Sequence, residues 1–355
     1  MMRVKVIAEA GVNHNGSLET ALELVDAAAE AGADVVKFQT FKAKSLATRM
    51  APTADYQARH GEVSQYEMLK QLEFGTEAHV QVLQRCSDRG IEFLSTPFDE
   101  ESLKFLVEDI GVGCIKFSSG DITNGPLLVE AAKTGKHVIL STGMSTLGEI
   151  EQALGMLAFG YTHADSPPTL AAFESAYFSS AGRKSLLENV TLLHCTTEYP
   201  APFADINLRA METMRNCFGL PVGYSDHSKG ISVPVAAVAL GATIIEKHFT
   251  LDRELPGPDH KASLEPDELE QMVRSIREVE TALGSSLKQP AASELGNRFV
   301  ARKSLVAACD IRIGEHFTPD NLAVKRPGDG ISPIQYWAWL DKVADKDYAE
   351  DEQIK

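Results

Sequence analysis

The chain has 355 residues, enough for one large domain and a small one, and its 44% hydrophobic and 24% charged residues are typical of a globular protein. Its formal net charge of −16 argues against general nucleic-acid binding, which needs a basic surface, and no apolar run is long enough to span a membrane. The N-terminus enters a strand pattern at once and lacks the layout of a signal peptide, so we expect a cytoplasmic protein that binds neither nucleic acid nor membrane.

Short runs rich in β-branched residues alternate with helical patterns as far as residue 283. Between the first two runs, Ser17 is expected to cap a helix that Gly32 ends. Eight such strands predict a (β/α)₈ TIM barrel over residues 1–283. An open eight-stranded sheet stays possible, but no GxGxxG follows the first strand. The runs span 4–11, 33–40, 91–98, 114–120, 137–143, 190–197, 220–226 and 242–249.

Two segments interrupt the alternation, and a second domain follows it. Residues 41–75 form a long polar connection, a candidate lid over the barrel mouth. Residues 158–189 insert a segment with Pro and Ser and one further helix before the sixth strand. Residues 284–299 are expected to form a linker. The strand-like pieces KSLVAACDI and LAVKRPG predict a small β-rich domain over 300–355.

Polar residues occur at the ends of most of these apolar runs. In a (β/α)₈ barrel the reactive groups lie at the C-terminal ends of the strands. Residues two apart on a strand share a face, so these side chains are expected to converge on one polar pocket. They are Glu9, Lys37, Gln39, Thr96, Lys116, Ser119, Ser141, His194, Thr197, Ser225, His227, Glu246 and His248.

Two late runs, GLPVGYSDHS and GATIIEKHFT, end near His227 and His248. One such histidine alone is more often a hydrogen-bonded core or rim residue, but the pair on consecutive strands favours a divalent metal. Imidazole with oxygen ligands suits Mn²⁺, with Mg²⁺ or Co²⁺ as alternatives. A cysteine zinc site is not expected, because the five cysteines form no CxxC. An open metal site would be catalytic, and Glu9 would be either a base beside the bound water or a structural carboxylate.

Lys37 and Lys116 both occur within apolar runs, which favours a shared anionic ligand over two lysines that reach solvent separately. The serines of SSG and STG, Ser119 and Ser141 among them, could simply form turns. With the lysines and loop N–H groups they would instead form a phosphate and carboxylate cradle. A nucleotide is not implied, since no Walker sequence is present.

Motifs along nearly the whole chain resemble the sialic acid synthases, that is, N-acetylneuraminate and other nonulosonate synthases. They are IAEAGVNHNGS, VVKFQT, STPFD, IKFSSGD, ILSTGM, LLHCTTEYPAP, GYSDHS, EKHFT and PGPDH. The C-terminal AACDIRIGEHFTPDNLAVKRPGDGI resembles the antifreeze-like SAF domain of that family. The motifs of both domains occur in family order, so the resemblance is highly specific.

The resemblance implies a transferase that condenses phosphoenolpyruvate with the open-chain aldehyde form of an N-acyl amino sugar. N-acetylmannosamine and a 2,4-diacetamido-trideoxyhexose are the candidate sugars, and the products are a nine-carbon α-keto acid and phosphate. It also implies a domain-swapped homodimer in which each SAF domain covers the partner's barrel. By the same resemblance, His227 and His248 bind the metal, and Glu9 contacts its bound water. Phosphoenolpyruvate contacts Lys37, Lys116, Ser119, Ser141, Thr197 and Ser225; the sugar contacts Gln39, Asp121, Tyr199, Asp259 and, from the partner subunit, Arg326.

Two positions depart from many N-acetylneuraminate synthases: Thr197 replaces Asn near the phosphoenolpyruvate site, and Asp121 replaces Glu near the sugar. The shorter Asp121 leaves room for a different or bulkier substituent. LLHCTTEYPAPF and the 158–189 segment resemble the legionaminate branch more than the sialate branch.

Two other functions are weighed against this one. A Schiff-base aldolase would use Lys116 to attack a keto acid. A non-enzymatic protein would use the SAF-like domain as a binding or ice-surface module on a barrel scaffold. The density of polar strand ends argues against the second.

Overall fold

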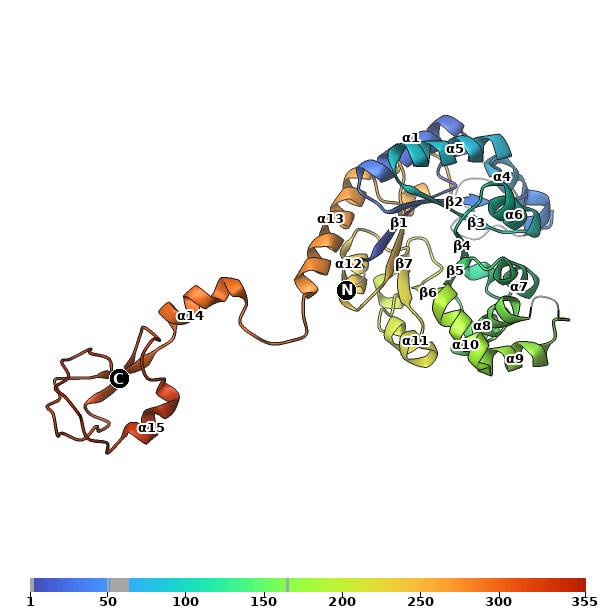
Figure 1. Cartoon of the computed structure of the whole chain (residues 1–355). Helices are drawn as coiled ribbons and strands as arrows, with labels where there is room; N and C mark the ends of the chain where they lie inside the picture. Colours follow the sequence, from blue (N-terminus) through green and yellow to red (C-terminus); the bar gives the residue numbers. More distant parts are fainter. Residues whose placement is uncertain (1–2, 50, 52–63, 164–165) are drawn as a thin grey trace. The chain divides into compact units, whose positions relative to one another are not determined.

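The computed structural model describes residues 3–49, 51, 64–163 and 166–355. The chain divides into two compact units, the first ending at Gly284 and the second covering Ser285–Lys355. Figure 1 shows the strands of the first unit enclosed by its helices. Among the described helices, none combines the length and the apolar character needed to cross a membrane.

The eight strands expected in the first unit form one parallel sheet in the order β3-β2-β1-β8-β7-β6-β5-β4. Pairing of β1 with β8 joins the first strand to the last and wraps the sheet into a barrel. β3 and β4 lie in contact at the two ends of this order, and no ladder pair between these two described strands is present. The TIM-barrel prediction is confirmed. The strands are β1 (Lys5–Gly11), β2 (Val35–Thr40), β3 (Glu92–Pro97), β4 (Cys114–Phe117), β5 (His137–Ser141), β6 (Val190–Cys195), β7 (Val222–Asp226) and β8 (Ile244–His248).

Helices surround this sheet and bury its outer face (Figure 1). As expected, the Ser17 hydroxyl accepts the N–H of Thr20 at 3.3 Å and caps the first helix, and Gly32 follows its end with φ +76°. The helices are α1 (Leu18–Glu30), α2 (Ala43–Leu46), α4 (Gln65–Leu72), α5 (Thr76–Arg89), α6 (Glu100–Lys104), α7 (Gly125–Lys133), α8 (Leu147–Thr162), α9 (Leu170–Phe178), α10 (Ser180–Asn189), α11 (Ala210–Phe218), α12 (Ser232–Ala239) and α13 (Pro266–Leu283).

The inserted segment 158–189 contains two further helices, α9 and α10, where one was expected. The sequence signal for the boundary is Ser179, whose hydroxyl accepts the N–H of Gly182 at 2.9 Å and starts α10 directly after α9. Of the candidate lid at 41–75, residues 50 and 52–63 lie outside the described residues, and the flanking parts form α2 and α4.

The second unit contains α14 (Leu295–Ala301), β9 (Ser304–Ala307), β10 (Leu322–Lys325) and α15 (Tyr336–Trp339). β9 and β10 pair antiparallel, in agreement with the small β-rich domain expected here. Its own core is formed by Leu305, Ala307, Ile311, Phe317, Leu322, Ala344, Tyr348 and Ile354.

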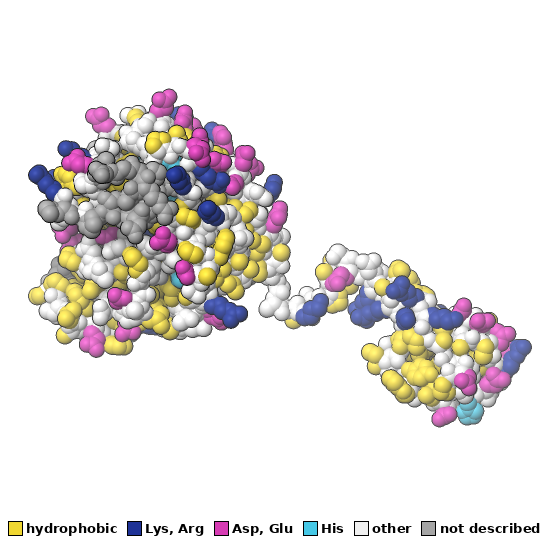
Figure 2. Space-filling model, turned by 180° about the vertical axis from the view of Figure 1, so that it is seen from behind, with side chains coloured by type: hydrophobic (Ala, Val, Ile, Leu, Met, Phe, Trp, Pro, Cys, Tyr) yellow, Lys and Arg dark blue, Asp and Glu magenta, His cyan; other side chains and the backbone are white. Residues whose placement is uncertain are grey.

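Residues 285–303, which we call the arm, are exposed and include α14. Figure 2 shows Lys and Arg side chains gathered along it. The arm carries four basic residues against one acidic residue in a chain of net charge −16. It also exposes four large apolar side chains, Leu287, Leu295, Phe299 and Val300.

Candidate active site

Alternate strand residues point into the barrel, so each inward layer has a defined composition. One inward layer is apolar and consists of Ile7, Val35, Leu94, Ile139, Leu193 and Ile244. Further toward the C-terminal ends of the strands, the inward side chains are polar and line a cavity of about 450 Å³. The apolar layer therefore closes the barrel beneath a polar site. This site lies at the C-terminal ends of the strands, as the sequence predicted.

Most of the predicted site residues line this one cavity: Glu9, Lys37, Gln39, Lys116, Ser119, Ser141, Thr197, Tyr199, Ser225, His227, His248 and Asp259. Part of its wall comes from residues beside or within the flanks of the candidate lid, namely Leu46, Ala47, Gln65, Met68, Leu69 and Leu72.

Asp121 and Arg326 lie elsewhere. Asp121 is in a helical turn, Ser119–Asp121, and is not one of the residues that line the cavity. Its carboxylate accepts from the Ser118 hydroxyl at 2.7 Å and from the Asn124 amide at 3.3 Å, and burial raises its pKa. Arg326 belongs to the second unit, where it is exposed and its Nε donates to the Ala301 carbonyl at 3.1 Å.

The expectation that His194 joins the pocket was wrong. Its Nε2 lies 2.7 Å from the carbonyl oxygen of Ile206, and the side chain is not part of the cavity lining. Alternation along β6 explains this, because Leu193 belongs to the inward apolar layer and its neighbour must face outward.

Four buried charges form the floor of the site. Lys37 Nζ lies 2.6 Å from Glu9 Oε2 and 3.7 Å from Glu246 Oε2, while Lys116 Nζ lies 3.3 Å from Glu246 Oε1. All four side chains are at most 5% exposed. The sequence placed Glu246 at a strand end but assigned it no role. Its carboxylate also accepts from the Ser225 hydroxyl at 2.8 Å, so it links both lysines to β7.

Burial and neighbouring charges shift the pKa values of Glu9 and Glu246 in opposite directions. Burial raises the pKa of Glu9 to about 7 against the opposing charge of Lys37. The pKa of Glu246 is lowered to about 2, because Lys116 and Lys37 outweigh its burial. Glu246 is thus a permanent counter-ion, whereas Glu9 can exchange a proton near neutral pH. Burial also lowers the pKa of Lys116, although Glu246 opposes the shift.

Beside the lysines, the β5, β6 and β4 ends surround the backbone of Gly143. Its N–H donates to Ser119 Oγ at 2.9 Å and to Cys195 Sγ at 3.1 Å. A Cβ at this position would lie 2.3 Å from Thr197 Oγ1 and 2.8 Å from Ser119 Oγ. Among the described residues, the buried Thr197 Oγ1 has no hydrogen-bond partner. We call the Ser119 and Thr197 hydroxyls, with the Gly143 backbone between them, the hydroxyl cradle; its two hydroxyls line the cavity and can donate to an anion beside Lys116.

The two histidines lie together at the mouth, with ring centroids 5.7 Å apart. His227 Nδ1 is 2.6 Å from the Thr196 carbonyl oxygen, so this nitrogen carries the hydrogen and Nε2 presents its lone pair. The Tyr199 hydroxyl lies 3.1 Å from that Nε2 and its ring stacks on the imidazole. Burial lowers the pKa of His227 to about 4 and that of His248 well below its usual value, so both rings are neutral.

His248 Nδ1 is buried without a hydrogen-bond partner in the described structure and lies 3.8 Å from Asp259 Oδ2. Burial raises the pKa of Asp259 to about 6. Two neutral imidazoles fit a divalent cation: Nδ1 of His248 has no partner in the described structure, and at Nε2 of His227 the cation would replace the Tyr199 hydroxyl. Across the described ranges, no group of three or more His, Cys, Asp or Glu side chains could hold a metal, so other ligands would be water or substrate.

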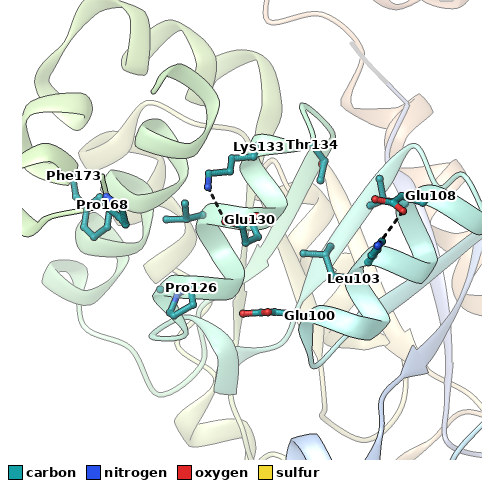
Figure 3. Close-up of a pocket in the computed structure, with 13 residues that line it drawn as sticks. Glu100, Leu103, Glu108, Pro126, Glu130, Lys133, Thr134, Pro168 and Phe173 are labelled. Atoms are coloured by element: carbon teal, nitrogen blue, oxygen red, sulfur yellow. Dashed lines mark hydrogen bonds and ion pairs between the residues drawn. The ribbon is translucent and has the colours of Figure 1, made fainter. Parts of the chain in front are cut away.

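A larger hollow of about 660 Å³ lies outside the barrel between α6, α7 and the segment before and within α9. Four of its charged side chains form two ion pairs, Lys133 with Glu130 and Lys104 with Glu108 (Figure 3). None of the strand-end residues lines it. The chemistry therefore lies in the smaller cavity.

Fold and site together define a barrel enzyme with a buried polar pocket in which two lysines lie near two neutral histidines. The NeuB family profile matches residues 24–288, and the SAF domain profile matches residues 302–355. The chain therefore belongs to the NeuB family, the sialic acid synthases, and carries their SAF domain.

Relatives are similar along nearly the whole chain. The N,N'-diacetyllegionaminic acid synthase of Campylobacter jejuni is 47% identical over 100% of both chains. That of Legionella pneumophila is 46% identical over 93% of this chain and 87% of its own. The crystal structure of the N-acetylneuraminic acid synthetase of Leptospira borgpetersenii, in complex with citrate, is 37% identical with a TM-score of 0.65, covering 83% of this chain and 90% of that one.

Proposed function

We propose that this enzyme makes N,N'-diacetyllegionaminate by condensing phosphoenolpyruvate with 2,4-diacetamido-2,4,6-trideoxymannose. The observation that carries the reaction class is the single cavity that combines two buried lysines, the hydroxyl cradle and two neutral histidines. The choice of sugar is supported by identities of 47% and 46% to two N,N'-diacetyllegionaminic acid synthases.

Phosphoenolpyruvate would bind on the floor of the site. Lys37 and Lys116 would offset its phosphate and carboxylate charges, and Glu246 stabilises both ammonium groups before the ligand arrives. The hydroxyl cradle would donate to one anionic group, with Ser141 and Ser225 lining the same cavity. This arrangement would allow a highly anionic substrate to bind inside a protein of net charge −16.

The sugar aldehyde would lie above the floor, between the histidines and the remaining polar wall. Gln39, Tyr199 and Asp259 line that part of the cavity and can bond to sugar hydroxyls. Asp121 would act from the turn beside Ser119 rather than from the lining itself.

Bond formation then follows in order. C3 of phosphoenolpyruvate attacks the aldehyde carbon, whose oxygen takes up a proton. The positive charge that develops at C2 is captured by water, which gives up a proton. The C–O bond from the tetrahedral C2 centre to phosphate then breaks, and the C2 hydroxyl gives its proton to the departing phosphate, which leaves the keto group. Glu9, with a pKa of about 7, suits the role of proton acceptor for the attacking water.

His227 and His248 would hold a divalent cation, most suitably Mn²⁺, with Mg²⁺ or Co²⁺ as alternatives. Such an ion would supply Lewis-acid polarisation of the aldehyde oxygen. The fit rests on the orphaned Nδ1 of His248 and on the lone pair that the Thr196 contact leaves on Nε2 of His227.

We further propose a domain-swapped homodimer in which Arg326 reaches the sugar N-acyl group in the other subunit's site. The exposed apolar side chains of the arm, such as Phe299 and Val300, support the existence of a partner surface. We also propose a cytoplasmic location, which is supported by the proposed use of phosphoenolpyruvate, an intermediate of cytoplasmic metabolism.

A Schiff-base aldolase is the second candidate, because burial lowers the pKa of Lys116 as nucleophilic lysines require. Phosphate release separates the two. With phosphoenolpyruvate and Mn²⁺, we expect release only when an acceptor sugar is added, fastest with 2,4-diacetamido-2,4,6-trideoxymannose rather than N-acetylmannosamine or the altrose isomer. Release that persists after chelation, or a preference for another sugar, would contradict the corresponding part of the proposal.

A further inference from the structure

Directly behind the two histidines, on the opposite face of their strands, lies a buried ion pair that the reaction does not use. Lys247 Nζ is 2.5 Å from Asp226 Oδ2, and both side chains are 0% exposed. Strand alternation turns them away from the cavity, because Ser225 on β7, His227 directly after β7, and Glu246 and His248 on β8 line it.

The pair lies across the β7–β8 ladder. Asp226 and Lys247 are directly opposite each other in the strand register. Each also immediately precedes one of the two histidines in the sequence. A slip of the register by one residue would separate the two charges and would turn one of the histidines away from the other.

The same pair also holds the loop that begins at His227. Asp226 Oδ1 accepts from the Tyr224 hydroxyl at 3.1 Å and from the Ser228 N–H at 3.0 Å. Lys247 Nζ donates to the Ser228 carbonyl oxygen as well. Together with the N–H of Ala201, which donates to the His227 carbonyl at 2.9 Å, these bonds fix the backbone on both sides of the imidazole.

Two fully buried charges are a costly way to fill a space between a sheet and its helices, since apolar residues of similar volume are often at least as stabilising. A charged pair differs from an apolar contact in being directional. The contact between Asp226 and Lys247 therefore favours one register of β7 against β8. We infer that Asp226 and Lys247 are positioning residues that set the spacing and orientation of His227 and His248 for cation binding.

This inference rests on the proposed role of the two histidines as metal ligands. It is tested by titrating Mn²⁺ into the apo full-length enzyme by calorimetry, alongside thermal unfolding. Lys247→Met is expected to weaken Mn²⁺ binding by roughly 10- to 100-fold, the loss typical of outer residues that orient metal ligands. KM for phosphoenolpyruvate should stay near the wild-type value, because neither Asp226 nor Lys247 lines the active-site cavity.

Because Lys247→Met leaves Asp226 buried and uncompensated, it could unfold the protein. The double variant Asp226→Leu/Lys247→Met removes both charges and should recover stability but not Mn²⁺ affinity. Arg277→Met serves as the matched control, because Arg277 pairs with Asp34 at 2.5 Å at the other end of the barrel strands. It should lower stability and leave Mn²⁺ binding unchanged.

Wild-type Mn²⁺ affinity in a folded double variant would overturn the inference while leaving the metal assignment intact. A wild-type enzyme that binds no Mn²⁺, Mg²⁺ or Co²⁺ would instead overturn the metal assignment, and the positioning role with it.

Discussion

The hydroxyl cradle can be blocked by one methyl group without changing any charge. In Gly143→Ala, the new Cβ would lie 2.3 Å from Thr197 Oγ1, 2.8 Å from Ser119 Oγ and 3.1 Å from Cys195 Sγ. The first two atoms end side chains that can rotate, so we expect them to turn away from the cavity. The fold should lose about 1–3 kcal/mol, as is typical when a group is added at a well-packed buried position.

Binding of phosphoenolpyruvate should suffer far more. A hydrogen bond to a charged group contributes about 1.5–3 kcal/mol. Loss of two such bonds from the cradle would cost about 3–6 kcal/mol, which lowers kcat/KM for phosphoenolpyruvate by roughly 10²- to 10⁴-fold. Continuous phosphate-release assays at saturating sugar measure this value, and thermal unfolding measures the effect on the fold.

Gly148→Ala is the matched control, because its Cβ would meet only Thr146 Oγ1 at 3.9 Å in the first turn of α8. It should keep full activity and gain up to about 1 kcal/mol from helix propensity. A Gly143→Ala enzyme with an unchanged KM for phosphoenolpyruvate would refute the assignment of the cradle to this substrate.

Four further results are expected. His227→Ala and His248→Ala should each lower kcat by at least about 10³-fold with circular dichroism unchanged, and near-normal turnover at saturating sugar would contradict the metal site. Borohydride with pyruvate should leave Lys116 unmodified by mass spectrometry, whereas a reduced adduct would favour the aldolase. Because Glu9 is protonated as pH falls through about 7, kcat should decline on the acid side, and Glu9→Gln should remove that limb; an unchanged limb would exclude Glu9 as the base. Arg326→Ala should mainly raise the sugar KM, and equal losses in kcat and kcat/KM would place Arg326 at the transition state.

Much of the site could be predicted from the sequence because side chains along a strand alternate between the inward and the outward face of the barrel. Lys37, Lys116 and His248 occur at the ends of apolar runs, and in a barrel those ends meet. The same rule explains the mistake with His194, since one residue of uncertainty in register exchanges the inward and outward faces of β6.

Other features needed three-dimensional coordinates. Glu246 was visible as a strand end, but its contact with two lysines from different strands depends on how far each side chain reaches across the barrel. The pairing of Asp226 with Lys247 likewise depends on the β7–β8 register, which the sequence of either strand alone does not specify. The role of Gly143 follows from the side chains around it rather than from a turn.

The central claim is tested most directly by the product formed from phosphoenolpyruvate labelled at its methylene carbon and 2,4-diacetamido-2,4,6-trideoxymannose. Mass spectrometry should detect a nine-carbon keto acid that retains the label, with one phosphate released for each product molecule. Both signals should disappear when the sugar is omitted. Phosphate release without a labelled nine-carbon product, or labelled pyruvate in its place, would contradict the account.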